Sequence, residues 1–551
     1  MTGFAPTGEQ QDIVDAAGTG ANLTIEAGAG TGKTSTLQFL ADRLTGKRGL
    51  YIAYNKAIQR EAERKFPSSV TCKTAHGLAF GPVGRNFRHR LDAPRVPAYR
   101  AAQLLRITEP VKLGGVVADQ DVTLTEKQLA RLVMETIQKF CYSNDAEITP
   151  WHVPYVTGVA RDAQRELARY LAPIAQRAWD EDITQKNGNL RFTHDAYLKM
   201  FCLTNPQLPF DYVLLDEAQD SNGSVAGLVE RQRHQKILVG DRCQSIYQWR
   251  GATDAMEKFE GQRFYLTQSF RFGPAIADEA NKWLSLIDGA VLRLTGFDQI
   301  PSRLAELDAP DAVLCRSNGG AISRVIAELD KGRRAALVGG GADIKRFAEA
   351  AEQLEAGRPT DHPELMAFSA WAEVQEYVQS GEGSDMKVLV NLVDRHGSRE
   401  LAGLVDRLTD ERYADVTIST AHKAKGREWH KVQIASDFPP PKGDEDKGIE
   451  PRVAREDAML AYVAVTRAQH VLDREGLAWV DEFAAATPAA PTVSAIPAPA
   501  APVVIAAPAP VVDDEPDPCD GYDPYCRRCK RYFRKCTCAV MPDRRPLVAA
   551  R

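Results

Sequence analysis

The segment LTIEAGAGTGKTS, residues 23–35, gives the clearest indication of the fold of this 551-residue chain. Its apolar start at residues 23–26 predicts a β-strand, and its end leads into a helix predicted for residues 34–44. The glycines between them favour a loop whose backbone N–H groups face bound phosphates at the N-terminus of the helix. A strand, a Gly-rich loop and a helix in this order indicate a phosphate-binding loop within a parallel α/β sheet.

The residues of this loop have distinct expected roles. Lys33 would reach the β- and γ-phosphates of a nucleotide, and the Thr34 hydroxyl would hold Mg²⁺. Ala27 stands where the first glycine is usual, so a Gly-rich turn without a ligand remains the alternative for the loop taken alone. The residues predicted to bind ATP here are Ala27, Gly28, Ala29, Gly30, Thr31, Gly32, Lys33, Thr34 and Ser35.

A second segment, VLLDEAQD at residues 213–220, completes the predicted metal site. Its apolar strand would deliver Asp216 to Mg²⁺ and place Glu217 beside it, where it can orient and deprotonate the attacking water. A lone Asp-Glu pair at a strand end is more often a solvated turn. The phosphate loop in the same chain favours the catalytic interpretation, with ATP and Mg²⁺ as cofactors.

Apolar strand patterns recur along the chain and predict an α/β fold with two sheets. Mainly helical insertions interrupt both sheets; the patterns at residues 125–140 and 159–180 belong to the first insertion. Strands of the first sheet are predicted at residues 23–26, 49–53, 212–215 and 236–239, and strands of the second at 263–266, 312–315, 335–338, 416–419 and 431–434.

Composition limits the class of protein. The formal net charge of −5 gives no sign of nucleic-acid binding, although contacts confined to one groove are compatible with it. No apolar run approaches the roughly 20 residues that span a bilayer. The N-terminus also lacks the pattern of a signal peptide, so we expect a cytoplasmic protein without membrane contacts.

The end of the chain has a different composition. Residues 484–518 are rich in Ala, Pro and Val, which predicts a semi-extended linker. Residues 519–551 form a basic tail with five cysteines, and such a cluster in the cytosol favours metal over disulfides. The alternative is a disordered tail with free thiols. A tetrahedral zinc site needs four thiolates, and the favoured ligands are Cys526, Cys529, Cys536 and Cys538.

Further short motifs follow in an order typical of one family. From about residue 6 to about residue 477 the chain resembles superfamily 1 DNA helicases of the UvrD/Rep/PcrA type, and within them the helicase portion of the F-box DNA helicases. The motifs that carry the resemblance, besides the two above, are TGEQ at residues 7–10, AYNK at 53–56, CKTAH at 72–76, VGDRCQSIYQWRGA at 239–252, LTQSFRF at 266–272, STAHKAKGRE at 419–428 and YVAVTRA at 462–468.

The resemblance implies roles at the nucleotide. Gln10 would contact adenine, Phe270 would stack on it, and Glu428 would bind the ribose. Two arginines would stabilise charge on the transferred phosphoryl group, although either one taken alone could be a surface residue. The implied catalytic residues are Lys33, Glu217, Gln244, Arg271 and Arg467, with Gln244 coupling the γ-phosphate to DNA.

The resemblance also implies a groove for single-stranded DNA, where aromatic side chains can stack on bases of any sequence. Without the family, Trp249 could be a core aromatic, and the histidines could be ordinary core or surface imidazoles. The implied DNA-binding residues are Tyr54, Thr74, His76, Tyr247, Trp249, Arg250 and His422.

The fold implied by the resemblance is a pair of RecA-like P-loop NTPase domains with ATP in the cleft between them. A helical insertion projects from each domain. The predicted boundaries are residues 1–84 and 206–262 for domain 1A, 85–205 for insertion 1B, 263–344 and 411–483 for domain 2A, and 345–410 for the short insertion 2B.

The chain departs from the family pattern at several places. Ser35 replaces an arginine that often covers the other face of adenine, which weakens the expectation of selectivity for adenine. Arg427 and Trp429 stand where Leu and Phe are usual. Insertion 2B looks shorter than in UvrD, and no F-box is recognised, so neither duplex contacts by 2B nor ubiquitin-ligase assembly is carried over.

The sequence therefore predicts an ATP-dependent DNA helicase that moves on single-stranded DNA in replication, recombination or repair, with 3′→5′ polarity implied by the family. Expected partners are single-stranded DNA, single/double-strand junctions, and replication or recombination proteins bound by the tail. High Ala and Arg usage indicates a bacterial or phage-infected host cell, where the protein would associate with the nucleoid. The alternatives are a translocase that strips proteins from DNA and a DNA-structure binding protein switched by ATP.

Overall fold

The computed structural model describes residues 5–93, 96–115, 121–156, 159–246, 255–360, 362, 364–365, 368–379, 386–443 and 450–484. The predictions for Tyr247, Trp249 and Arg250 lie outside the described residues. The same holds for the linker after residue 484 and for the four predicted zinc ligands. In the part of the chain that is described, no helix is both long and apolar enough to cross a membrane.

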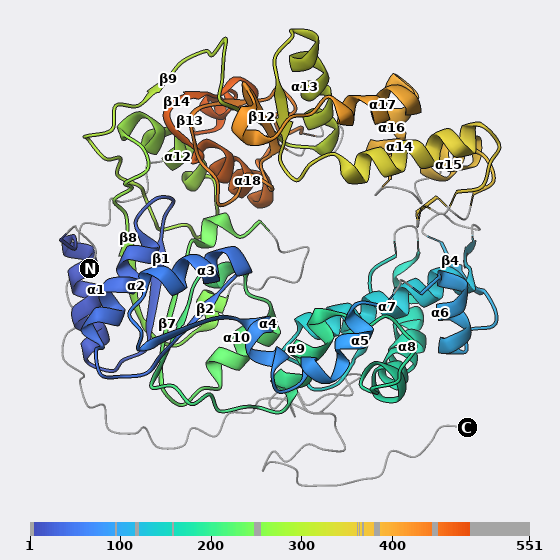
Figure 1. Ribbon diagram of the computed structural model, residues 1–551, viewed down its shortest axis with the longest axis horizontal. Coiled ribbons are helices and arrows are strands. Elements are labelled where there is room, and N and C mark those ends of the chain that lie inside the picture. The colour runs from blue at the N-terminus through green and yellow to red at the C-terminus, as the bar shows by residue number, and fades with distance from the viewer. Residues whose placement is uncertain are drawn as a thin grey trace. The chain divides into compact units, whose positions relative to one another are not determined.

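The first sheet is parallel and has the strand order β3-β2-β6-β7-β1-β8. Its central strands are buried along their whole length, or nearly so, as expected for a parallel sheet covered on both faces. The helices α1 (Gly8–Gly18), α2 (Lys33–Arg43) and α3 (Lys56–Lys65) pack on one side of it (Figure 1). The strands are β1 (Leu23–Ala27), β2 (Gly49–Ala53), β3 (Val70–Thr74), β6 (Tyr212–Leu215), β7 (Gln235–Gly240) and β8 (Gln262–Leu266).

The prediction that residues 263–266 belong to the second sheet is wrong. This segment forms β8, which pairs in parallel with β1 from Leu23↔Gln262 to Ala27↔Leu266. An apolar stretch predicts that a strand exists, but it does not identify the neighbouring strand. The first sheet therefore extends through Leu266, and the segment that follows β8 lies directly beside the phosphate loop.

The second sheet has the order β11-β12-β10-β13-β14-β9, and its strands also pair in parallel. One hydrophobic core joins it to the helices α12 (Pro274–Ser285) and α18 (Arg455–Val465). α13 (Asn318–Asp330) packs in another core, and α19 (Val480–Ala484) ends the described chain. The strands are β9 (Arg303–Leu304), β10 (Ala312–Cys315), β11 (Ala335–Leu337), β12 (Val416–Thr420), β13 (Trp429–Ile434) and β14 (Ala468–Asp473). The predicted fold of two RecA-like α/β domains is confirmed.

The first insertion leaves the first sheet after β3 and returns at β6. It is mainly helical, as predicted, and includes one short antiparallel pair of strands, β4 (Val111–Gly114) and β5 (Asp121–Leu124). Its helices are α4 (Ala75–Phe80), α5 (Arg88–Leu91), α6 (Ala98–Leu105), α7 (Glu126–Tyr142), α8 (Arg161–Ala178) and α9 (His194–Leu203). After β6 the chain forms α10 (Gly223–Glu230), and α11 (Ala255–Lys258) precedes β8.

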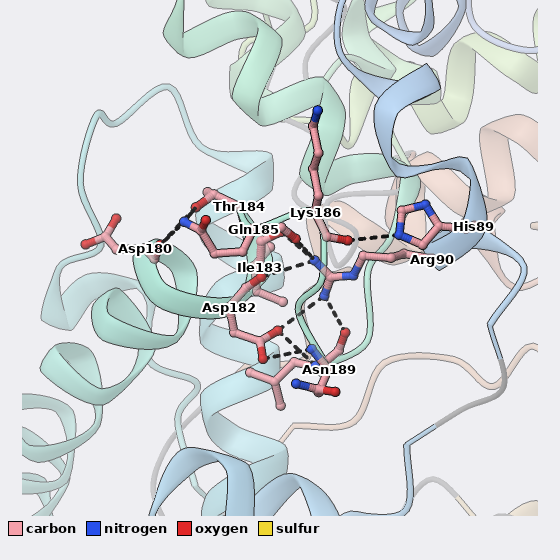
Figure 2. Close-up of polar contacts among 10 residues, drawn as sticks. His89, Arg90, Asp180, Asp182, Ile183, Thr184, Gln185, Lys186 and Asn189 are labelled. Atoms are coloured by element: carbon pink, nitrogen blue, oxygen red, sulfur yellow. Dashed lines mark hydrogen bonds and ion pairs between the residues drawn. The ribbon is translucent and has the colours of Figure 1, made fainter.

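A buried arginine fixes the turn that follows α8 (Figure 2). Nη1 of Arg90 donates to the carbonyl oxygens of Asp182, Ile183 and Gln185 at 3.1, 2.9 and 2.7 Å. Nη2 donates to the carbonyl oxygen of Leu190 at 2.7 Å and to Oδ1 of Asp182 at 3.2 Å. The guanidinium thus donates to four backbone acceptors, two in the short π-helix Trp179–Ile183 and two in the segment that follows it.

The second insertion packs on one face of the second sheet. It consists of α14 (Ala342–Glu355), α15 (Trp371–Gln379), α16 (Lys387–His396) and α17 (Ser398–Asp406). Phe347 and Leu354 of α14 share a hydrophobic core with Val313 of β10 and Ile418 of β12. This insertion therefore continues the core of its domain.

Candidate nucleotide-binding site

A cavity of about 490 Å³ lies at the phosphate loop and is lined by residues from both RecA-like domains. The loop contributes Ala29 through Ser35, and Glu217 and Gln244 follow strands β6 and β7. The cavity brings all five predicted catalytic residues together, whereas Gln10, Ala27, Gly28 and Asp216 are not part of its wall. The remaining lining residues are Tyr54, Asn55, Ile58, Asp220, Phe270, Arg271, Lys425, Gly426, Glu428 and Arg467.

The phosphate loop needs glycine where the segment after β8 approaches it. Gly30 has φ 76°, and a Cβ atom there would lie 2.5 Å from Cβ of Arg271 and 2.6 Å from Oγ of Ser269. The backbone N–H of Phe270 donates to the carbonyl oxygen of Gly30 at 2.8 Å. This close approach brings Phe270 and Arg271 to the edge of the loop.

Two residues predicted to contact adenine are placed differently. Gln10 is buried, its Oε1 accepts from the backbone N–H of Thr7 at 3.0 Å, and its Nε2 donates to Oγ1 of Thr36 at 3.0 Å. Phe270 is 40% exposed on the cavity wall, with Phe297 edge-on at 5.5 Å between ring centroids. Phe270 therefore has a partly exposed ring on the cavity wall, while Gln10 bonds to Thr36 of α2 and is not part of the wall.

The acidic pair stands at the end of β6. Glu217 has φ 49°, an unusual left-handed conformation for a residue other than glycine, and its N–H donates to Oδ1 of Asp216 at 2.9 Å. Burial, followed by the charge of Glu217, raises the pKa of Asp216. Burial also acts on Glu217, but Lys33 and Lys425 outweigh it and lower its pKa. Glu217 is therefore ionised at neutral pH, as a base requires.

The residues at this edge fit a magnesium ion bound together with a nucleotide. Mg²⁺ usually takes one or two carboxylates, with phosphate oxygens and water completing an octahedron. Asp216 offers a fixed carboxylate, and Thr34 offers a hydroxyl in the first turn of α2. Among the described residues there is no cluster of three or more His, Cys, Asp or Glu side chains that could hold a metal ion without a nucleotide.

A buried polar network connects the two domains beside the cavity. Nε2 of Gln244 donates to Oδ2 of Asp241 at 2.6 Å, and Oε1 of Gln244 accepts from Nη2 of Arg467 at 3.2 Å. The Tyr462 hydroxyl donates to Oδ2 of Asp241 at 2.9 Å and accepts from the backbone N–H of Ala29 at 3.1 Å. A continuous chain of hydrogen bonds therefore connects Ala29 of the phosphate loop to Arg467.

Arg271, the other arginine predicted to stabilise the phosphoryl group, is paired with Glu428, which is predicted to bind the ribose. Nε of Arg271 donates to Oε2 of Glu428 at 2.5 Å, and Nη1 donates to the carbonyl oxygen of Thr466 at 3.2 Å. Oε1 of Glu428 accepts from Nε2 of Gln469 at 3.0 Å. Arg271 and Glu428 therefore form an ion pair at the cavity wall.

Lys425 is a cavity residue that was not among the residues predicted from the sequence. Its Nζ donates to Oδ2 of Asp220 at 2.5 Å and to the carbonyl oxygen of Gln244 at 2.6 Å. Lys425 comes from the segment after β12, and both of its partners belong to the first domain. It lies within a motif that the resemblance had already marked, but no periodicity or charge pattern separates it from the exposed Lys423 two residues earlier.

The predicted DNA-binding residues that the structure describes do not gather in this cavity, with one exception. Tyr54, just before α3, lines the cavity. The Thr74 hydroxyl caps α4 by accepting from the N–H of Gly77 at 3.0 Å, and Nε2 of His76 lies 3.1 Å from Oδ1 of Asp195 in the first insertion. His422 follows β12, where burial and then Arg316 lower its pKa.

Two family models match parts of this chain that contain residues of the cavity. Residues 189–262 match the family model of the UvrD/REP helicase N-terminal domain, and residues 343–473 match that of the UvrD-like helicase C-terminal domain. The first match contains Glu217 and Gln244, and the second contains Lys425, Glu428 and Arg467.

Several curated proteins are similar to this chain. F-box DNA helicase 1 of Gallus gallus is 30% identical over 508 residues, which is 85% of this chain and 48% of the relative. F-box DNA helicase protein 1 of Schizosaccharomyces pombe is 30% identical over 516 residues, 84% of this chain and 56% of the relative. A probable DNA helicase II homolog of Mycoplasma pneumoniae is 37% identical over 89 residues, 14% of this chain and 12% of the relative.

The chain thus spans about half the length of the two relatives it matches over most of its residues. Both of these relatives are eukaryotic. They do not support the prediction of a bacterial or phage-infected host cell.

Proposed function

Because the chain carries the N-terminal and C-terminal domains of UvrD-like helicases, we propose that it is an ATP-dependent DNA helicase that translocates on single-stranded DNA. The observation that carries the proposal is the cavity whose wall combines Lys33, Glu217 and Gln244 of the first domain with Arg271 and Arg467. Closing such a cleft around ATP and opening it after hydrolysis would move the two domains relative to a bound strand.

Several residues of the site have proposed roles in the reaction. Glu217 orients the attacking water and accepts its proton, while the bond between the γ-phosphorus and the bridging oxygen of ADP breaks. Lys33, Arg271 and Arg467 stabilise the charge on the transferred phosphoryl group. Magnesium, held by Thr34 and Asp216, would neutralise phosphate charge when bound.

Gln244 is the proposed link between chemistry and movement. It contacts Arg467 through its side chain and Lys425 through its carbonyl oxygen, so it touches two residues of the opposite domain. Phe270 would stack on adenine, and Glu428 would leave Arg271 to bind the ribose. Thr74, His76 and His422 would contact the strand.

The direction of movement, the preferred DNA structure and the pathway are inferred from the family resemblance. We propose 3′→5′ movement, a preference for single/double-strand junctions, and a role in replication, recombination or repair. Stripping of proteins from DNA and ATP-switched binding of DNA structures are the competing activities. Zinc binding and partner recruitment by the basic tail remain part of the proposal.

The test compares ATP hydrolysis with and without single-stranded DNA for the wild type and Glu217→Gln. The substitution keeps the size of the side chain and removes the base, so a stimulated rate should fall by at least about 100-fold, the usual contribution of a positioned base. ATP hydrolysis that DNA does not stimulate would contradict translocation and favour the binding switch.

A further inference from the structure

A buried tyrosine contacts the predicted magnesium ligand from the neighbouring strand. Tyr51 lies on β2 and is 0% exposed, and its hydroxyl donates to Oδ2 of Asp216 at 2.5 Å. β2 and β6 are adjacent in the sheet, with Tyr51 opposite Leu214, and the backbone N–H of Asp216 continues the ladder to the carbonyl oxygen of Ile52 at 3.2 Å. The contact is therefore fixed by the register of the sheet.

The Tyr51 ring has little freedom to move. It is fully buried in the core between the first sheet and helices α1 to α3, and it packs on Phe66 with 4.9 Å between ring centroids. A tyrosine hydroxyl is protonated at neutral pH and can donate one hydrogen bond. Here that bond goes to a carboxylate oxygen.

The two oxygens of Asp216 are held from two sides. Oδ1 accepts from the backbone N–H of Glu217 at 2.9 Å, and Oδ2 accepts from Tyr51. A carboxylate oxygen has two lone pairs, so each oxygen keeps acceptor capacity after these bonds. The plane of the carboxylate is nevertheless set by its two donors.

We propose that Tyr51 is a positioning residue, which holds the Asp216 carboxylate in the orientation that receives Mg²⁺ with the nucleotide. The proposal rests on the metal site of the proposed function and adds to it a residue outside the motif series. Outer partners of metal-binding carboxylates commonly change metal affinity by 10- to 100-fold when they are removed.

The sheet supplies a matched control in Tyr212. It lies on β6, it is 0% exposed, and its hydroxyl has no hydrogen-bond partner among the described residues. Tyr51→Phe and Tyr212→Phe therefore each remove one buried hydroxyl from the same sheet. Only the first substitution removes a contact to Asp216.

The test titrates Mn²⁺ into the full chain with saturating ADP and follows free Mn²⁺ by electron paramagnetic resonance. Tyr51→Phe should weaken Mn²⁺ binding by about ten-fold, with unchanged affinity for ADP in the presence of EDTA. Tyr212→Phe should leave both affinities unchanged. The Mg²⁺ concentration for half-maximal ATP hydrolysis should rise for Tyr51→Phe alone.

Wild-type Mn²⁺ affinity in Tyr51→Phe would overturn the proposal. An equal loss in both variants would overturn it too, because the effect would then come from the fold. A loss of ADP affinity in Tyr51→Phe, measured without metal, would also show that the substitution affects the fold and not the metal site. If the wild type shows no DNA-stimulated hydrolysis, the proposed function fails, but the Mn²⁺ comparison still decides the role of Tyr51.

Discussion

Arg467 is a buried cation whose side chain reaches the nucleotide cavity. Its guanidinium donates to the carbonyl oxygen of Val463 at 2.9 Å, to the Thr466 hydroxyl at 3.0 Å and to Oε1 of Gln244 at 3.2 Å. These contacts hold the planar group in one orientation. A cation that is already oriented can stabilise developing charge without reorganisation at the moment of reaction.

Arg467→Lys keeps the positive charge but loses the planar guanidinium group with its several N–H donors. We expect the maximal rate of ATP hydrolysis to fall by about 100-fold or more, since arginine fingers contribute about 10³-fold or more. Binding of a fluorescent ATP analogue should change by less than about three-fold. The control is Arg452→Lys, because Arg452 pairs with Asp288 at the surface, where its side chain is 77% exposed. An equal loss of rate in both variants would contradict the role.

Tyr54 lies at the nucleotide cavity and not in the predicted DNA groove. The resemblance assigns it to the DNA groove, but its side chain lines the nucleotide cavity. Tyr54→Ala should therefore raise the KM for ATP by about five-fold, the effect of losing roughly 1 kcal/mol of contact. Its dissociation constant for single-stranded DNA, measured without nucleotide by fluorescence anisotropy, should stay within two-fold. Weaker DNA binding of Tyr54→Ala at an unchanged KM for ATP would indicate that Tyr54 contacts DNA, as the resemblance implies.

Some of these residues could be predicted from sequence and others could not. Lys33 and Glu217 stand in motifs whose spacing reflects a required geometry, so they were found without a structure. Tyr51 is one apolar-strand residue among several, and only the register between β2 and β6 shows that it meets Asp216. Contacts that depend on which strands are neighbours leave no local pattern in the sequence.

At the scale of elements, the same limit applies to β8. Its residues predict a strand correctly, but its pairing with β1 depends on the path of the chain after β7. β3 was not predicted because VTCKT is only five residues long and carries no long apolar run, although its alternation of buried and exposed positions is typical of a strand. Long helices such as α7 were predicted to within a few residues because their pattern repeats over several turns.

The Arg90 contacts in Figure 2 predict how the first insertion is stabilised. Arg90→Ala would remove one donor from each of four carbonyl oxygens and the ion-pair partner of Asp182, at a cost of roughly 3 kcal/mol for opening the segment. Trypsin should then cut at Lys186 or Arg191 about 100-fold faster than in the wild type. Arg88→Ala is the control, since Arg88 is exposed on the same helix. Unchanged cleavage in Arg90→Ala would show that other contacts hold the segment.

A ring of four charges joins α12 to α19. Glu279 contacts Lys282 and Arg474 at 2.9 and 3.2 Å, and Asp481 contacts the same two cations at 2.6 Å each. The hydrogen bonds from Arg474 and Lys282 lower the pKa of Asp481 to about 2. Because this pKa lies below the unfolded value of 3.8, the ring stabilises the fold above about pH 4 and loses this contribution as pH falls toward 2.

Asp481→Asn should therefore lower the melting temperature at pH 7 by about 2 °C. The difference from the wild type should shrink as the pH is lowered from 5 to 3, which thermal unfolding across that range would measure. Asp288→Asn, at an exposed pair, should have little effect at any pH. A difference for Asp481→Asn that stays constant down to pH 3 would mean that charge is not its cause.

At the scale of the whole molecule, the two RecA-like domains meet at hydrogen bonds that each belong to a motif. Lys425 reaches Asp220, Arg467 reaches Gln244, and Tyr462 reaches Ala29. The fold of each domain could be predicted from its own strands and helices. The pairing of residues across the cleft could not, because it depends on both folds at once.

Displacement of one strand from a duplex with a single-stranded 3′ tail, driven by ATP, would show directly whether the protein is a helicase. We expect ATP-dependent displacement by the wild type, none by Glu217→Gln, and much less from a duplex with a 5′ tail. Displacement without ATP hydrolysis, or tight DNA binding with no displacement from either tail, would contradict a helicase and leave a protein whose ATP site only switches DNA binding.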